Sequence, residues 1–171
     1  DLFDTALPNI ELLKETAHEL SRLKENDIPV YIIPGSHDFS PSGKTMLDVF
    51  ESAGLTTNVV KGEPDADGKL KLRFTEDHKT GIKITGLIGK KGGLEKSYYY
   101  NLSRENLETE KGYKIFMFHT AITELKTKEL ANMDAMPISL LPAGFNYYAG
   151  GHVHIVDKKD FEGYTNVVYP G

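Results

Sequence analysis

Four of the six histidines in this chain follow hydrophobic segments with the composition of buried strands. Loops at the ends of such strands are where functional side chains gather in α/β proteins. Imidazole and oxygen ligands without sulfur suit manganese, iron or zinc. The pattern therefore predicts a metal site in strand-end loops. The strands cover residues 29–33, 114–118 and 145–149, and the histidines after them are His37, His119, and His152 with His154.

The sequence Gly-Gly-His-Val-His at residues 150–154 is the densest part of this pattern. Two histidines two residues apart on an extended backbone point their rings to the same side. The paired glycines allow a tight turn at the strand end. A lone His-x-His is more often a surface pair than a metal site, so its weight depends on the histidines of the other loops. Asp1 adds a carboxylate if a strand precedes it.

The elements that would position these residues alternate between helix and strand in the first third of the chain. We predict a helix over residues 9–26, a strand over 29–33 and a helix over 43–53 capped by Ser42. Strands around residues 57–61, 70–74 and 82–88, with turns between them, indicate an antiparallel part of a mixed sheet. Residues 122–130 are predicted to be helical, and residues 155–169 to form a hairpin.

Composition limits the classes of protein that fit. The 171 residues are enough for one domain, and the 39% hydrophobic content argues against disorder. The absence of cysteine excludes disulfides and thiolate chemistry and is consistent with an intracellular, cytoplasmic protein. There is no membrane-spanning run. The net charge of −5 argues against a uniformly basic nucleic-acid binder, although residues 61–96 hold nine Lys and Arg against six Asp and Glu.

Four short motifs resemble those of the calcineurin-like metallophosphoesterases. They are Asp-Leu-Phe-Asp at residues 1–4, Gly-Ser-His-Asp at 35–38, Phe-His-Thr at 118–120 and Gly-His-Val-His at 151–154. Within that superfamily the first two motifs are similar to those of the SbcD-type double-strand-break-repair nucleases. The resemblance implies an α/β sandwich of mixed β-sheets flanked by helices. Residues 1–171 would form one metallophosphoesterase domain, cut at both ends, without the first motif strand and the C-terminal capping region.

The resemblance also implies roles for individual residues. Asp1 matches the aspartate that bridges two divalent metal ions, in this branch manganese. Ser36, His119 and His152 match ligands of the second ion, and His154 matches a ligand of the first. His37 matches the histidine that contacts the scissile phosphate, and Asp4 matches the acid that orients that histidine.

Two departures from the family pattern affect these roles. The family's first motif, Asp-x-His, is absent before Asp1, so the first metal site would be incomplete. Ser36 stands where the family usually has asparagine, and its shorter hydroxyl is a weaker ligand. We therefore expect the second site, formed by Asp1, His119 and His152, to be the better preserved one.

The resemblance implies a metal-dependent DNA exonuclease and endonuclease of a double-strand-break repair complex. Its partners would be DNA, an SbcC-type ATPase subunit and a second copy of the chain. Two alternatives stay open. One is another calcineurin-like phosphodiesterase or phosphatase that acts on small phosphoesters, and the other is a non-catalytic scaffold with a degraded site. The three neighbouring tyrosines at residues 98–100 could pack on the core or stack against bases in a substrate groove.

Overall fold

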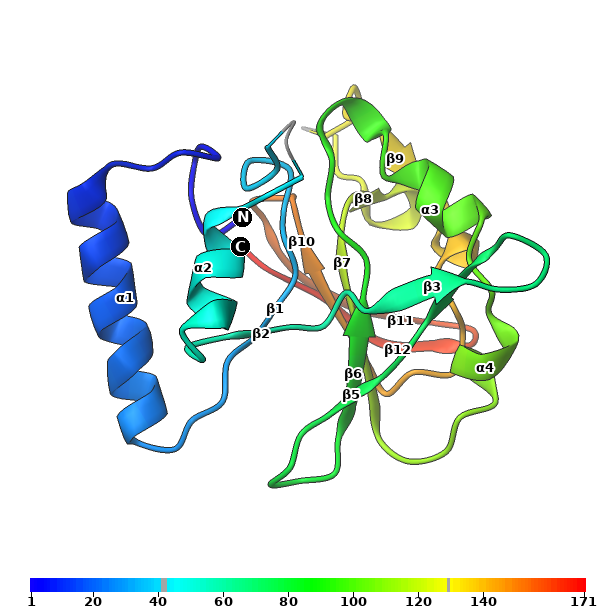
Figure 1. Ribbon diagram of the computed structural model, residues 1–171. Helices are drawn as coiled ribbons and strands as arrows, with labels where there is room; N and C mark the ends of the chain where they lie inside the picture. The colour runs from blue at the N-terminus through cyan, green and yellow to red at the C-terminus, as the bar shows by residue number, and fades with distance from the viewer. Residues whose placement is uncertain (41–42, 129) are drawn as a thin grey trace.

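The computed structural model describes residues 1–40, 43–128 and 130–171, and its framework is a six-stranded sheet with the order β11-β12-β10-β7-β6-β5 (Figure 1). The inner strands β12, β10, β7 and β6 run parallel, and the outer strands β11 and β5 are antiparallel to their neighbours. The predicted mixed sheet is confirmed, but of the three segments expected to form its antiparallel part only 82–88 contributes a strand to it, and residues 57–58 and 70–72 lie in separate two-stranded sheets. Its strands are β5 (Thr75–Glu76), β6 (Lys83–Gly86), β7 (Lys114–His119), β10 (Tyr147–Gly151), β11 (Val156–Phe161) and β12 (Tyr164–Pro170).

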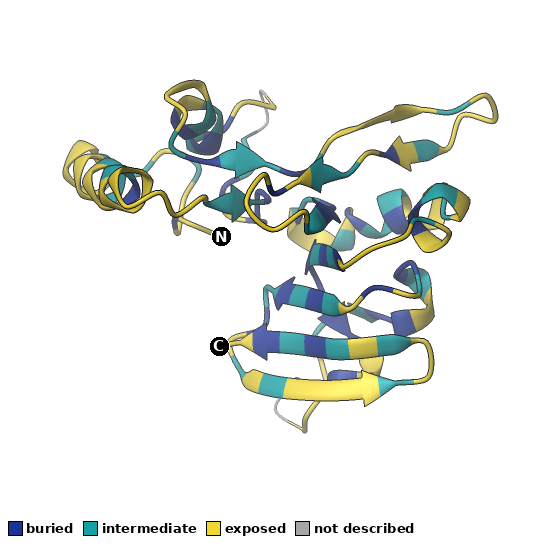
Figure 2. Ribbon diagram, turned by 90° about the horizontal axis from the view of Figure 1, so that it is seen from below, coloured by how far each residue is buried: buried dark blue, intermediate teal, exposed yellow. Residues whose placement is uncertain are grey.

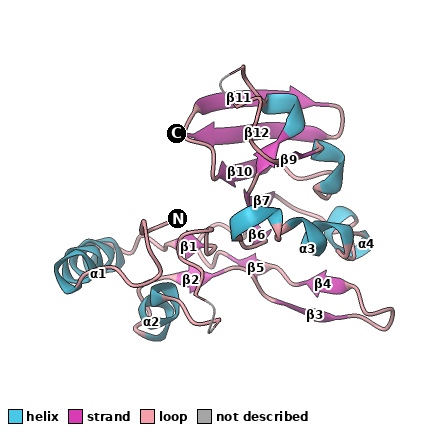
Figure 3. Ribbon diagram, turned by 90° about the horizontal axis from the view of Figure 1, so that it is seen from above, coloured by secondary structure: helices cyan, strands magenta, loops and turns pink. Residues whose placement is uncertain are grey.

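Three smaller sheets surround this framework. The parallel pair β1 (Tyr31–Ile32) and β2 (Thr57–Asn58) lies beside α1 and α2, and the hairpin of β3 (Gly62–Pro64) and β4 (Leu70–Leu72) projects from the opposite end of the molecule (Figure 3). The parallel pair β8 (Ala121–Ile122) and β9 (Ala135–Met136) follows β7. The helices are α1 (Ile10–Glu25), α2 (Met46–Ser52), α3 (Lys96–Tyr100) and α4 (Glu105–Glu108), with 3₁₀ turns at Lys91–Gly93, Thr123–Leu125 and Ile138–Leu140.

Helix α1 begins and ends close to where its sequence signals predict. The side chain of Asn9 caps its first turn by accepting a hydrogen bond from the backbone N–H of Leu12, and Asn26 follows its last turn. Leu13, Ala17 and Leu20 pack into one apolar cluster, as expected from their helical spacing. Ile10, which fits the same spacing, is exposed because it lies at the open end of the helix. Figure 2 shows how narrow the buried stripe of α1 is.

Strand β7 divides the core into two parts. Its side chains alternate between the faces of the sheet, so Phe116 and Phe118 enter the largest apolar cluster, while Ile115 and Met117 pack against the cluster that contains Ile33. This buried position on both faces explains the uninterrupted apolar sequence of the strand. It also fixes the direction of His119, the last residue of β7.

Two of the predicted elements are wrong in detail. Residues 122–130 were expected to be a helix, but the described part of this segment holds the end of β8 and a single 3₁₀ turn. Pairing of β8 with β9 takes precedence over the helical spacing there. The helix predicted from residue 43 begins at Met46, where Thr45 and Asp48 form a reciprocal capping box. Ser42, the expected cap, lies outside the described residues.

Candidate metal centre

The candidate site forms where the loops after β1, β7 and β10 meet the first residues of the chain. Strand β7 pairs in parallel with β10, and His119 lies opposite Gly151. The two strands therefore end at the same level, and His152 follows one residue later. The rings of His119 and His152 lie 5.2 Å apart, centroid to centroid. Sheet register thus explains why two histidines 33 positions apart in the sequence become neighbours.

Glycines make room for the His119 ring. A Cβ atom on Gly89 would lie 2.4 Å from Cδ2 of His119, and one on Gly151 would lie 2.9 Å from Nδ1. Both distances are too short for any side chain without a shift of the ring. The backbone N–H of Gly89 also donates to the carbonyl of Pro34 at 2.8 Å, which ties the loop after β6 to the loop after β1. His119 is therefore held in one position by its surroundings.

Oxygen atoms from two other segments converge on Nε2 of this buried imidazole. Nε2 of His119 lies 3.2 Å from Oδ2 of Asp1 and 3.4 Å from Oγ of Ser36. The other oxygen of Asp1, Oδ1, accepts a hydrogen bond of 2.7 Å from the backbone N–H of His37. Asp1, Ser36 and His119 are thus brought together as the sequence predicts.

Burial controls the protonation of the two histidines. Desolvation lowers the pKa of His119 to about 4, assisted by the positive charge of the amino terminus and opposed by Asp38. The pKa of His152 is also lowered, first by burial and then by the neighbouring His119. Both imidazoles are therefore neutral near pH 7, which is the form that binds a metal ion.

The donors fit a divalent metal ion in chemical type. The carboxylate, hydroxyl and neutral imidazole lie at separations close to the edge of a coordination polyhedron. Among the described residues, however, no three His, Asp or Glu side chains are gathered closely enough to enclose an ion. Asp1, Ser36 and His119 form a partial ligand set, with His152 beside it.

The remaining predicted residues are not brought into this set. His37 is exposed in the turn that follows β1. His152 adopts φ +85°, so the extended backbone expected through residues 150–154 is wrong there. The change of direction leaves Val153 buried and His154 exposed. Asp4 is exposed, and within the described residues it makes no hydrogen bond or ion pair to His37.

Asp38 is one of the residues to which the sequence assigned no role. Its buried carboxylate accepts hydrogen bonds from the backbone N–H groups of Leu2 and Phe3 at 3.2 Å and of Gly35 at 2.9 Å. It therefore fastens the segment that carries Asp1 to the loop that carries Ser36. The sequence shows an acidic residue directly after Gly-Ser-His. It does not indicate that residues 2 and 3 would donate hydrogen bonds to this residue.

A cleft of about 370 Å³ opens beside the candidate ligands. The buried carboxylate of Glu95 faces it: Oε1 accepts a hydrogen bond of 3.0 Å from Thr120 Oγ1, and Oε2 has no partner within the described residues. Neither Glu95 nor the lysines of this cleft were singled out from the sequence. The lining residues are Ser36, His37, Lys90, Lys91, Gly92, Gly93, Glu95, Asp134 and His152.

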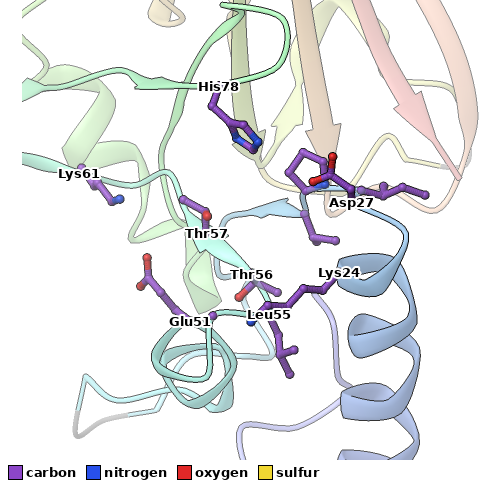
Figure 4. A pocket seen from close by; sticks show the side chains of 12 residues that line it. Lys24, Asp27, Glu51, Leu55, Thr56, Thr57, Lys61 and His78 are labelled. Atoms are coloured by element: carbon purple, nitrogen blue, oxygen red, sulfur yellow. The ribbon is translucent and has the colours of Figure 1, made fainter.

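A slightly larger cavity, of about 400 Å³, lies at the amino-terminal ends of β1 and β2 (Figure 4). None of the predicted site residues lines it. Lys24 and His78 line it together with Asp27 and Glu51, so its charges are of mixed sign. Asp27 forms an ion pair with Lys79, and Glu51 accepts a hydrogen bond from the backbone of Asn58. Volume therefore does not identify the site in this fold; the convergence of donor groups does.

Comparison with known proteins identifies the family of the chain. The family of calcineurin-like phosphoesterases matches residues 1–156, and the chain belongs to this family. Among curated proteins it is similar to the DNA double-strand break repair protein Mre11 of Archaeoglobus fulgidus, with 26% identity over 100% of the chain, and to that of Sulfolobus acidocaldarius, with 31% identity over 95%. The chain spans 39% of the length of each of these two relatives.

One finding concerns membranes. In the part of the chain that the structure describes, no helix combines the length and the apolar character that crossing a bilayer requires.

Proposed function

We propose that this chain is the catalytic domain of a metal-dependent DNA nuclease that acts in double-strand-break repair. The observation that carries the proposal is the convergence of Asp1 and Ser36 on Nε2 of the buried, neutral His119. Membership of the phosphoesterase family supports hydrolysis of a phosphoester. The similarity to DNA double-strand break repair proteins supports DNA repair as the context.

The residues of the site would divide the work between them. Asp1, Ser36, His119 and His152 would hold divalent cations, manganese in our proposal and two in number. Bound cations of this kind polarise a phosphoryl oxygen and lower the pKa of a coordinated water. His154, which is exposed, would provide a further metal ligand on the solvent side of the site. Asp38 would hold the segments of Asp1 and Ser36 together through the three backbone N–H groups that donate to it.

His37 would serve the leaving group rather than the metal. Its side chain lines the cleft and its backbone N–H is bound to Asp1, so the ring lies beside the ligand set without being part of it. An imidazolium in that position can donate a proton to the departing oxygen. Asp4 would orient His37 when substrate is bound.

Repair nucleases of the SbcD type suggest the wider assembly. We propose an SbcC-type ATPase partner and a homodimer for the protein that contains this chain, working inside the cell where its DNA substrate lies. Cleavage of linear and single-stranded DNA with Mn²⁺ tests the core of the proposal. Hydrolysis of bis-p-nitrophenyl phosphate with no cleavage of DNA would favour a small-molecule phosphodiesterase instead.

The variant His37→Ala distinguishes the proposed roles. It is expected to keep the Mn²⁺ affinity of the protein, measured by calorimetric titration, and to lose most DNA cleavage. The matched variant His119→Ala should lose both. Equal loss of affinity and cleavage in His37→Ala would place His37 among the metal ligands.

The incomplete ligand set among the described residues is the observation that favours a second candidate, a scaffold without catalysis. A scaffold would bind its partner equally well with and without Mn²⁺, and His119→Ala would leave that binding unchanged. Loss of DNA cleavage in His119→Ala would exclude it.

A further inference from the structure

Lys90 lies beside the candidate metal centre and is held between two aromatic rings. Its Nζ atom lies 4.5 Å from the ring centroid of Tyr98 and 5.4 Å from that of Phe39. The three residues come from different segments: Phe39 from the loop after β1, Lys90 from the loop after β6, and Tyr98 from α3. Figure 1 shows these two loops at the same end of the molecule.

The ring contacts fix this ammonium group without neutralising it. Cation–π attraction orients a lysine head group, but it leaves the positive charge available to an anion. Within the described ranges, neither Lys90 nor Lys91 forms an ion pair with a carboxylate, and both line the cleft. A lysine that is already ordered also loses less side-chain entropy when it binds.

The two acidic side chains of the cleft each have a partner, although Oε2 of the Glu95 carboxylate has none within the described residues. The carboxylate of Asp134 forms an ion pair with Lys96, and that of Glu95 accepts a hydrogen bond from Thr120. Ser36, His37 and His152 line the same cleft on the side of the metal centre. An anion that enters the cleft therefore meets Lys90 and Lys91 close to the place where a scissile phosphate would lie.

We propose that Lys90 binds a backbone phosphate of the DNA strand, next to the phosphate that is cleaved. This inference rests on the proposed nuclease function and adds to it the residue that favours a polymer over a small ester. A small phosphoester has only the phosphate at the metal centre and cannot reach a second cation. DNA carries a phosphate on every nucleotide, so it gains the contact with Lys90.

The test compares Lys90→Met with Lys159→Met. Lys159 is a matched control because its Nζ atom also lies over an aromatic ring, 5.6 Å from the centroid of Phe161, but on β11. Affinity for a single-stranded oligonucleotide is measured in EDTA over a range of salt concentrations. Lys90→Met is expected to bind several-fold more weakly. The slope of log affinity against log salt concentration should become shallower by about 0.7, because one phosphate contact is lost. Lys159→Met should match the parent protein.

Two further measurements keep the test specific. Lys90→Arg should restore both affinity and salt dependence, because it keeps the cation over the rings. Cleavage of DNA should fall by a larger factor in Lys90→Met than hydrolysis of bis-p-nitrophenyl phosphate does. Equal DNA binding by Lys90→Met and Lys159→Met, or no rescue by arginine, would overturn the inference while the nuclease proposal stands. A parent protein that neither binds nor cleaves DNA would contradict both.

Discussion

Nε2 of His119 lies 3.2 Å from Oδ2 of Asp1, although 118 positions separate the two residues in the sequence. Asp1 is placed by its contact with the backbone of His37, and His119 by the parallel pairing of β7 with β10. The candidate centre therefore joins a carboxylate held by a loop to an imidazole held by a sheet. The carboxylate and the imidazole can each be tested by substitution.

Loss of the His119 imidazole should weaken metal binding more than loss of His154. His119→Ala removes the buried donor that faces Asp1 and Ser36, and Mn²⁺ affinity should fall by about tenfold or more. His152→Ala should have the next largest effect, and His154→Ala, at an exposed position, the smallest. Calorimetric titration of each variant measures these constants. Occupancy lost in His154→Ala but retained in His152→Ala would contradict the assignment.

Removal of the Asp38 carboxylate should loosen the segment that carries Asp1. Asp38→Ala leaves the backbone N–H groups of Leu2, Phe3 and Gly35 without their acceptor. The expected loss is about 2–3 kcal/mol in the free energy of unfolding, measured with urea. Asp4→Ala, at an exposed site, should change it by less than about 0.5 kcal/mol. Similar values for the two variants would show that Asp38 does not anchor the segment.

A single methyl group at position 35 should displace Asp1. A Cβ atom there would lie 2.1 Å from Oδ1 of Asp1, so Gly35→Ala forces the carboxylate away from His119. Metal affinity should fall, as measured by titration. Gly68→Ala is the control: it has open space around it but a φ of +76°, so it should lower stability and leave metal affinity unchanged. Unaltered Mn²⁺ binding in Gly35→Ala would argue against Asp1 as a ligand.

The metal-free protein should lose stability as the pH falls from about 6.5 to about 4. The pKa of His119 is about 4 in the folded protein and near 6.5 in the unfolded chain, so only the unfolded chain binds a proton in this interval. The free energy of unfolding therefore decreases as the pH falls below 6.5, by about 3 kcal/mol over the whole interval.

Urea unfolding at several pH values measures this effect. His119→Asn should flatten the profile over the interval, because the titrating group is gone. An equally steep profile in His119→Asn would assign the pH dependence to other groups.

The local sequence determined most of the elements and the identity of the candidate ligands. Asn9 and the spacing of Leu13, Ala17 and Leu20 define α1, and the apolar run of residues 115–118 defines β7. These features depend on hydrogen bonds and periodic burial within a few residues, so they can be predicted from the sequence. The strand at the start of the segment 122–130 could not, because Ile122 pairs with Met136 of β9, which is distant in the sequence.

Only the tertiary structure decided how the candidate ligands meet. The register of β7 and β10 sets the distance between His119 and His152, and the left-handed backbone of His152 separates it from His154. Two of the partners of Asp38, Leu2 and Phe3, lie 36 and 35 positions away from it, and the rings around Lys90 come from the loop after β1 and from α3. Residue type and spacing carry the chemistry of single groups, whereas the geometry between groups depends on long-range packing, which spacing along the chain does not encode.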